Sequence, residues 1–230
     1  EVQKNIGAEN AVAFDINAAC SGFLFALDTA ALYLEHGGYQ HALVIGAETL
    51  SKMMDWTDRS TCVLFGDGAG AAVLSASKED GILSMVQGSD GFRGDVLNCM
   101  ARKVNNPYKK SDTALSYVSM NGQEVYRFAV KTVPKAVTDA VEQAGLHLAE
   151  IDLFQLHQAN YRIIEAVSKR LGQPMEKFPT NLEECGNISA ASVPILLDNV
   201  NNHGMMRKGM KIVLAGFGAG LTWGATVINW

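Results

Sequence analysis

Basic charge is scarce in this sequence. Its 230 residues carry 19 lysines and arginines against 24 aspartates and glutamates, a formal net charge of −5 at pH 7. Such a chain has no overall positive field to attract nucleic acid or an anionic membrane, so neither is expected as a partner. An acidic protein partner would require a local patch of basic residues.

Cysteine is also rare, and its spacing excludes two kinds of site. No C-x-x-C pair occurs, which argues against zinc, and a disulfide framework is not indicated in a chain of this length. We therefore expect no zinc site and a place in the reducing cytoplasm. The four cysteines are Cys20, Cys62, Cys99 and Cys185.

Long hydrophobic runs are almost absent. Residues 1–10 are polar, so no signal peptide is visible. Ile212–Trp230 carries no charge, but its glycines and its alternation predict strand, turn and strand rather than a membrane span. The sequence opens on Glu1 rather than methionine, and Gln3–Glu9 reads as the end of a helix. We therefore expect the N-terminal part of the fold to lie outside this sequence.

The hydrophobic pattern predicts an α/β protein. Ala11–Asn17 is typical of a buried strand, Gly22–Leu34 has helical periodicity, and Ala42–Gly46 is again strand-like. Strand, helix and strand in this order favour a parallel sheet. Further along we predict strand, glycine loop and strand over Thr61–Ser75, a surface loop over Asp90–Asp112, helices over Asn121–Gly145, Tyr161–Leu171 and Ser189–Asn202, and strands over Ile151–Leu156 and Lys211–Ala215.

A weak internal sequence repeat indicates a duplicated fold. Residues 63–70 (VLFGDGAG) resemble residues 213–220 (VLAGFGAG), and each stretch is followed by a strand of small residues. A single repeat of this kind is too few for a solenoid protein. It fits two fused halves, which we place at residues 1–112 and 113–230.

Cys20 is the first candidate for chemistry. A cysteine alone is more often a small buried hydrophobe than a nucleophile. Cys20, however, follows a predicted strand and begins a predicted helix, where the helix dipole and free N–H groups lower the pKa of a thiol. The small residues around it allow a tight turn and close approach of a substrate. We expect Cys20 to be a nucleophile.

His157 and Asn187 are the second and third candidates. His157 follows a predicted buried strand and lies at its carboxyl end, where α/β proteins place their sites. Asn187 precedes a helix beside Gly186, and an Asn in that context is by itself more often a cap or turn residue. The glycines of residues 216–220 could supply backbone N–H groups to an oxyanion, whereas Gly66–Gly70 has no reactive neighbour in sequence and is interpreted as structural.

The order Cys, His, Asn is shared with papain-like proteases. His157 lies 137 residues after Cys20, and Asn187 follows 30 residues later. The sequence around Cys20 lacks the C-G-[SA]-C-[WY] pattern of those proteases, and no disulfide-rich secreted design is apparent. Acyl transfer by another kind of enzyme is the better interpretation.

Together these strings resemble the β-ketoacyl-ACP synthase III family, the initiating condensing enzymes of bacterial fatty-acid synthesis in the thiolase superfamily (ACP, acyl carrier protein). The resemblance covers almost the whole chain, in AACSGF, DWTDRSTCVLFGDGAGAAVL, MNGQEVYRFAV, LHQANYRII, GNISAASVPILL and GFGAGLTWGATVI. It implies a thiolase-like α/β fold of two duplicated halves, with helices between and around mixed sheets and an incomplete N-terminal half. Family members begin well before the nucleophile, and a Trp and an Arg that hold the adenine of coenzyme A are missing here.

Details of the sequence separate this family from its relatives. Thiolases use a second cysteine in the last glycine loop, and Gly216–Gly220 has none. Elongating condensing enzymes use two histidines, and Asn187 stands in place of the second. Chalcone-type synthases share the three residue types but not the HQAN string of His157–Asn160.

The resemblance implies a role for each residue. Cys20 takes a short acyl group from acyl-CoA and condenses it with malonyl-ACP, which loses carbon dioxide. His157 and Asn187 donate hydrogen bonds to the enolate oxygen, and the backbone N–H groups of Cys20, Gly218 and Ala219 hold the tetrahedral oxyanion. Acyl-CoA and malonyl-ACP are substrates, and no metal or cofactor is implied. A homodimer is implied by the family alone.

The resemblance also implies two binding surfaces. The residues that match coenzyme A contacts are Arg59, Gly122, Tyr126, Ala159 and Asn160, with Tyr126 where Phe is common. The implied ACP dock consists of Gln158, Ala159, Asn160, Tyr161, Arg162, Arg127, Lys169 and Arg170. Arg162, Lys169 and Arg170 would share one helix face, and the less favoured alternative for Lys169 and Arg170 is a solvated charged face.

Two other functions stay open. A related acyltransferase of secondary metabolism would keep the three residues and use another acceptor. A silent partner subunit of a condensing complex is the non-enzymatic alternative, which the intact set of Cys20, His157 and Asn187 argues against.

Overall fold

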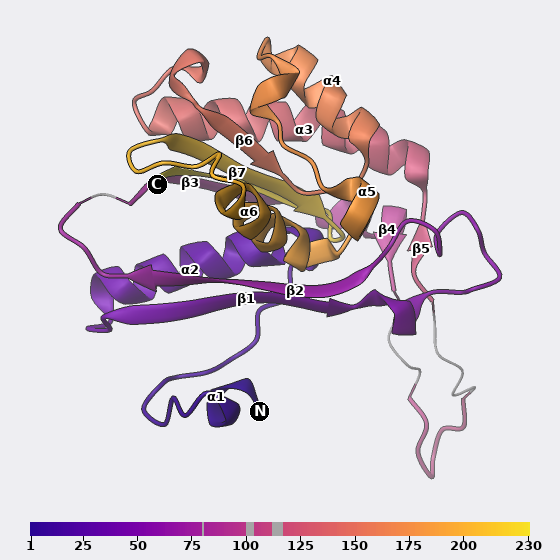
Figure 1. Cartoon of the computed structure of the whole chain (residues 1–230). Helices are drawn as coiled ribbons and strands as arrows, with labels where there is room; N and C mark the ends of the chain where they lie inside the picture. The colour runs from indigo at the N-terminus through magenta and orange to yellow at the C-terminus, as the bar shows by residue number, and fades with distance from the viewer. Residues whose placement is uncertain (80, 100–103, 112–116) are drawn as a thin grey trace.

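The chain is arranged in alternating layers of helix and sheet. The computed structural model describes residues 1–79, 81–99, 104–111 and 117–230. From top to bottom in Figure 1, a helical layer covers a larger sheet, two helices lie beneath that sheet, and a two-stranded sheet follows. Helix α1 (Val2–Asn5) contributes nothing to the core and lies below this body (Figure 1).

The larger sheet has mixed strand directions. Its order is β3-β8-β7-β6, with β6 parallel to β7 and the other neighbouring pairs antiparallel. Helices α3 (Gly122–Gln143) and α4 (Tyr161–Leu171) cover its outer face (Figure 1). The strands are β3 (Ile82–Ser89), β6 (Leu153–Leu156), β7 (Lys211–Gly218) and β8 (Thr222–Asn229).

The smaller sheet pairs β1 (His41–Thr49) with β2 (Asp67–Ser75) in antiparallel register. Helices α2 (Gly22–His36) and α6 (Ser192–Asn202) lie between the two sheets (Figure 1). Two glycines of β2 allow α6 and the residues just before it to approach closely. A Cβ on Gly68 would lie 3.0 Å from the Ile188 side chain, and one on Gly70 would lie 2.8 Å from the backbone nitrogen of Ile195.

The predicted strand over Ala11–Asn17 is not formed. These residues have no regular secondary structure and are all exposed, and Phe14 is 55% accessible. A strand needs a neighbour to satisfy its backbone groups, and no described strand pairs with this segment. The parallel pairing predicted for the first half is therefore wrong as well, because β1 is joined to β2 in antiparallel fashion.

The outer face of the small sheet is apolar, and none of the described residues covers it. Leu43, Ile45 and Val73 point outward with accessibilities of 45%, 39% and 70%. Their alternation with half-buried and buried residues shows that the inner face packs against the middle helices. The interpretation of Ala42–Gly46 as a fully buried strand was therefore correct only for one face.

The predicted glycine loop of the first half is part of a strand. Gly66 precedes β2, and Gly68 and Gly70 lie within it. On the face of β2 where Gly68 and Gly70 have no side chain, α6 and the residues just before it pack against the strand. The sequence alone does not indicate this contact. The division into halves at residue 112 stays a prediction, although β3 pairs with β8 and so favours a boundary between Ser75 and Ile82.

The helices and strands of the second half follow the sequence prediction. The 3-10 turn Ser189–Ala191 leads into α6, and β7, a turn and β8 occupy the charge-free C-terminal stretch. The predicted loop Asp90–Asp112 contains a 3-10 segment, Gly91–Val96, while residues 100–103 and 112 of it lie outside the described residues. The remaining short elements are β4 (Leu97–Asn98), β5 (Ser119–Met120), α5 (Leu182–Cys185) and the 3-10 segments Leu50–Met53, Leu148–Glu150 and Met175–Lys177.

Candidate active site

One cavity brings together the three residues singled out from the sequence. It measures about 490 Å³, and Cys20, His157 and Asn187 all line it. These residues come from three separate segments: the turn before α2, the turn after β6 and the turn before α6. The rest of the lining is Ser60, Leu64, Phe65, Leu97, Met120, Gly122, Val125, Tyr126, Ala159, Asn160, Arg162, Ile163 and Phe217.

Cys20 lies in a tight 3-10 turn directly before α2. Its neighbour Ala19 has a φ of +47°, and the backbone N–H of Ala19 donates to the Asn17 side chain at 3.1 Å. Burial raises the pKa of the Cys20 thiol to about 11, and the carboxylate of Glu48 adds to the rise, whereas a hydrogen bond with the Ser189 side chain opposes it. The lowered pKa predicted from the helix start is therefore wrong, because loss of solvent outweighs the favourable backbone N–H groups.

The end of β7 is packed against the Cys20 backbone. A Cβ on Gly218 would lie 2.6 Å from the Cys20 nitrogen and 3.1 Å from its Cβ. Only glycine fits at this distance. The hydroxyl of Thr222 lies 3.1 Å from the Ala18 carbonyl and 3.0 Å from that of Ala219. The C-terminal glycine turn is thereby held beside Cys20, and its role in binding an oxyanion stays a prediction.

His157 is a buried and uncharged imidazole. Its backbone N–H donates to the Ala215 carbonyl at 2.7 Å, which extends the β6–β7 pairing by one residue. Phe217 packs edge-on against the ring, with 5.6 Å between centroids. Burial lowers the pKa of His157 to about 3, so the ring is neutral at pH 7 and carries one proton. Ser192 Oγ lies 3.0 Å from its Nδ1 atom.

Asn187 is held so that its amide nitrogen is available to the cavity. Its Oδ1 accepts from the Ser189 backbone N–H at 2.9 Å. The Asn187 backbone donates to the Leu64 carbonyl at 3.0 Å and accepts from the Gly66 N–H at 2.9 Å. The carboxamide oxygen is thereby engaged, and Nδ2 is the donor that remains. This role of Leu64 and Gly66 could not be predicted from the sequence, because no motif links either residue to Asn187, 121 or more positions further along.

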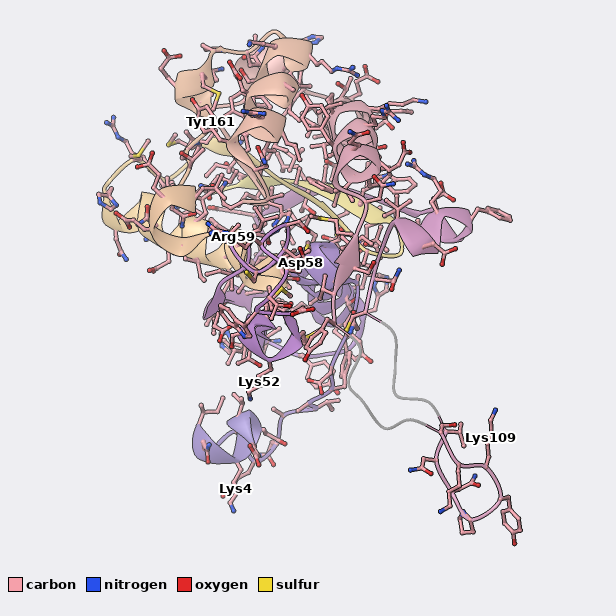
Figure 2. The ribbon with its side chains drawn as sticks, turned by 90° about the vertical axis from the view of Figure 1, so that its right-hand side faces the viewer. Lys4, Lys52, Asp58, Arg59, Lys109 and Tyr161 are labelled. Carbon is pink, nitrogen blue, oxygen red and sulfur yellow. The ribbon has the colours of Figure 1, made fainter. Side chains whose placement is uncertain are left out.

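The implied coenzyme A residues are only partly gathered at this cavity. Gly122, Tyr126, Ala159 and Asn160 line it, and Asn160 also caps α4 by accepting from the Arg162 N–H at 2.8 Å. Arg59 is exposed and is not among the lining residues, although its neighbour Ser60 is. In Figure 2 Arg59 faces the viewer together with Tyr161 of α4.

Most of the implied ACP residues are exposed on α3 and α4. Tyr161, Arg162 and Arg170 are exposed, and Lys169 forms an ion pair with Glu165 at 2.8 Å. Arg127 pairs with Glu124 at 2.6 Å and lies in a second, more open cleft along α3 rather than at the cavity of Cys20.

Gln158 has to be removed from that docking surface. It is completely buried. Its Nε2 donates to the Leu156 carbonyl at 2.8 Å, and its Oε1 accepts from the Asn181 N–H at 3.1 Å. A side chain with both ends bonded inside the protein does not contact a carrier protein.

The described part of the chain offers neither a metal-binding cluster nor a membrane helix. In that part of the chain, no group of three or more His, Cys, Asp or Glu side chains is placed to hold a metal ion. No described helix has the length and apolar character needed to span a bilayer.

The fold and the cavity define a class of enzyme. A thiol, a neutral imidazole and a primary amide line one cavity, and Gly218 at the end of β7 packs against the backbone of Cys20. A thiol can accept an acyl group, and the two neutral side chains can stabilise an enolate by hydrogen bonding. In a thiolase-like fold this set of groups defines a condensing acyltransferase.

Comparison with known proteins supplies the family. Residues 14–91 match the family model described as 3-oxoacyl-[acyl-carrier-protein] synthase III, and residues 141–230 match the model of its C-terminal part. The chain is 50% identical over 230 residues to the β-ketoacyl-[acyl-carrier-protein] synthase III of Clostridium acetobutylicum, which covers all of this chain and 71% of that protein. The corresponding Clostridium novyi protein gives the same identity and coverage.

Solved structures agree. The synthase III of Thermus thermophilus superposes with a TM-score of 0.92 at 42% identity, over 100% of this chain and 71% of that one. A priming β-ketosynthase of the R1128 polyketide pathway gives 0.92 at 38% identity, over 99% and 68%. The chain belongs to the β-ketoacyl-ACP synthase III family and is a condensing acyltransferase of the type that initiates fatty-acid synthesis.

Proposed function

We propose that Cys20, His157 and Asn187 carry out the two half-reactions of this chemistry. The Cys20 sulfur attacks the thioester of a short acyl-CoA, the acyl group moves to the sulfur, and the thiol proton ends on the departing coenzyme A. Malonyl-ACP then loses carbon dioxide, and its enolate attacks the acyl-Cys20 carbonyl. The products are β-ketoacyl-ACP and the regenerated thiol, which takes its proton from solvent.

The observation that carries this proposal is the shared cavity of the three groups. Asn187 Oδ1 is engaged by Ser189, which leaves its Nδ2 as a donor, and His157 is neutral with one further donor. Two neutral donors aimed at one oxygen stabilise an enolate without protonating it. Decarboxylation itself generates the carbanion, so no strong base is required.

The oxyanion of the acyl-transfer step would be held by backbone groups. We assign this role to the N–H groups of Cys20, Gly218 and Ala219, and the close packing of Gly218 on Cys20 supports the assignment. A donor of this kind is typically worth about 3 kcal/mol in the transition state. The high pKa of the thiol in the free enzyme means that activation has to accompany substrate binding.

The two substrates would reach the cavity from the side formed by α3 and α4. Gly122, Tyr126, Ala159 and Asn160 line the entrance and are assigned to coenzyme A or the matching arm of the carrier. Arg59 is kept as a contact for the outer part of coenzyme A, since Ser60 beside it lines the cavity. The acidic carrier would meet Arg162, Lys169 and Arg170, which are exposed on α4.

We also propose that the enzyme is a cytoplasmic homodimer. The support is an exposed apolar surface, in which Val12, Phe14 and Ile16 are 61%, 55% and 37% accessible. Apolar side chains exposed one after another along a segment are available for packing against a second copy of the chain. Light scattering should give twice the mass of the chain, and a monomer at micromolar concentration would contradict the dimer.

An acyltransferase of secondary metabolism is the second candidate. It is favoured by the resemblance to the R1128 priming ketosynthase and differs only in the acceptor. Strict dependence on malonyl-ACP separates fatty-acid initiation from this alternative. The silent subunit is not supported, because all three reactive residues are present at one cavity.

Intact-mass spectrometry tests the central proposal. Incubation with acetyl-CoA should add one acetyl group, located by peptide mapping on the Cys20 peptide and absent from Cys20→Ser. The exposed Cys99 provides the internal control for indiscriminate acylation. An adduct on Cys99 but not on Cys20 would overturn the assignment of the nucleophile.

A further inference from the structure

The proton of His157 can sit on either ring nitrogen, and only one position suits the proposed chemistry. The ring is neutral, so it has one N–H and one lone pair. Because His157 lines the cavity while its Nδ1 faces Ser192, donation to an enolate requires the proton on Nε2. The tautomer of a histidine is set by the partner of its other nitrogen.

Ser192 is that partner, and it has two possible acceptors for a single hydroxyl proton. Its Oγ lies 3.0 Å from His157 Nδ1 and 2.9 Å from the Ser189 carbonyl. If the proton points to Ser189, Ser192 accepts from Nδ1–H, and Nε2 presents a lone pair to the cavity. If the proton points to Nδ1, the ring proton is placed on Nε2.

The Ser189 carbonyl does not need the hydroxyl. It already accepts the backbone N–H of Ser192 at the start of α6. When the Ser192 hydroxyl turns toward Nδ1, both the Ser189 carbonyl and Nδ1 therefore have a hydrogen-bond donor. Ser192 and Ser189 are both buried, at 3% and 5% accessibility, so water does not compete for this bond. Turning the Ser192 hydroxyl from the Ser189 carbonyl to Nδ1 therefore costs little free energy.

We propose that Ser192 is a positioning residue that donates to His157 Nδ1 and so fixes the Nε2–H tautomer that catalysis requires. The proposal rests on the proposed donor function of His157. It extends the site to the last residue of GNISAAS, so that one short segment holds Asn187 through Ser189 and His157 through Ser192.

The test is the tautomer itself, measured by long-range ¹H–¹⁵N correlation on the ¹⁵N-histidine-labelled protein at pH 7.5. His157 signals are assigned by their loss in His157→Gln. We expect a protonated Nε2 and an unprotonated Nδ1 in the wild type. A protonated Nδ1 overturns the proposal without the use of any Ser192 variant.

Variants connect the tautomer to the reaction. Ser192→Ala removes the hydroxyl that faces Nδ1, which weakens the bias toward the Nε2–H form and should slow condensation about tenfold or more, with little effect on the rate of acyl transfer from acetyl-CoA to Cys20. Ser192→Thr keeps the hydroxyl and should restore both the tautomer and the rate. Equal losses in both half-reactions, or no rescue by threonine, would count against a positioning role.

Ser84→Ala is the matched control, because Ser84 is also buried and its hydroxyl donates to a backbone carbonyl, that of Ala140. It should leave the His157 signals unchanged. The result also separates the two proposals. A wild-type Nδ1–H tautomer with condensation abolished in His157→Gln rejects the role of Ser192 alone, whereas full condensation in His157→Gln rejects the proposed function.

Discussion

The side-chain oxygen of Gln158 accepts a hydrogen bond from the backbone N–H of Asn181 at 3.1 Å, and its amide nitrogen donates to the carbonyl of Leu156 at 2.8 Å. This buried amide joins the turn that carries His157 to the segment that leads to Asn187. The relative placement of the imidazole and the carboxamide therefore depends on a side chain that never reaches the cavity.

Replacing Gln158 by leucine should destabilise the protein by about 2–4 kcal/mol, because two buried backbone partners lose their bonds. Chemical denaturation measures this difference. Gln155→Leu is the matched control: Gln155 is equally buried, and within the described chain its Oε1 has no hydrogen-bond partner. That change should be neutral or stabilising, and equal losses in the two variants would contradict the linking role of Gln158.

Asp28 makes stability depend on pH. This carboxyl of α2 accepts bonds from Thr226 at 3.0 Å and from Gln87, but burial raises its pKa from 3.8 to about 6. The pKa of Asp28 is higher in the folded protein than in the unfolded chain. The protonated carboxyl therefore stabilises the folded protein below the unfolded-state pKa, and this stability is lost as the pH rises through 6. Asp28→Asn avoids the loss and should be more stable than the wild type by about 2–3 kcal/mol at pH 8.

The advantage of Asp28→Asn should become small near pH 3.5, where the wild-type acid is protonated in the folded protein and largely protonated in the unfolded chain. Denaturation midpoints at a series of pH values provide the measurement. Asp139→Asn, on the exposed side of α3 and paired with Lys135, should change stability by less than about 0.5 kcal/mol throughout. A difference for Asp28→Asn that does not vary with pH would show that its charge is not the cause.

Gly218→Ala should disrupt the nucleophile. Its Cβ would lie 2.6 Å from the Cys20 nitrogen, so either the turn or the C-terminal strand has to move. We expect acyl transfer to fall by about 100-fold, in line with the loss of an oxyanion donor. Gly81→Ala is the control, since a Cβ there meets no atom within 4 Å. An acylation rate for Gly218→Ala within twofold of the wild type would refute the close packing as a functional constraint.

Asn187→Asp separates the half-reactions. The new carboxylate can still accept from the Ser189 N–H, but it lacks the Nδ2 donor and places negative charge beside the developing enolate. Condensation should drop by about 100-fold or more, while acetyl-Cys20 still forms. Mass spectrometry of the adduct and a condensation assay give the two rates. Unimpaired condensation would remove Asn187 from the site.

Arg162→Glu tests the docking surface. Reversal of this charge on α4 should raise KM for malonyl-ACP by about tenfold or more, while KM for acyl-CoA changes far less, and the effect should weaken at high salt. Lys4→Glu reverses a charge on α1, far from α4 (Figure 2), and should change neither value. Equal effects of Arg162→Glu on both substrates would contradict the dock.

Several elements could be read from the sequence because local chemistry determines them. Tyr161–Leu171 became α4 with the predicted bounds, since its apolar periodicity and the Asn160 cap both favour that helix. The three reactive residue types were likewise visible in short strings, because each stands at the end of a strand or the start of a helix. The family followed from the same strings.

Tertiary structure alone decided what lies outside such local patterns. Ala11–Asn17 has the composition of a buried strand, yet it is exposed, because a strand exists only where a neighbour pairs with it. The Cys20 thiol has a raised pKa because the surrounding layers exclude water, although its place at a helix start indicates the reverse. Gln158 is buried, and Ser192 faces His157, for a similar reason: contacts between distant segments are set by packing, which no single stretch of sequence encodes.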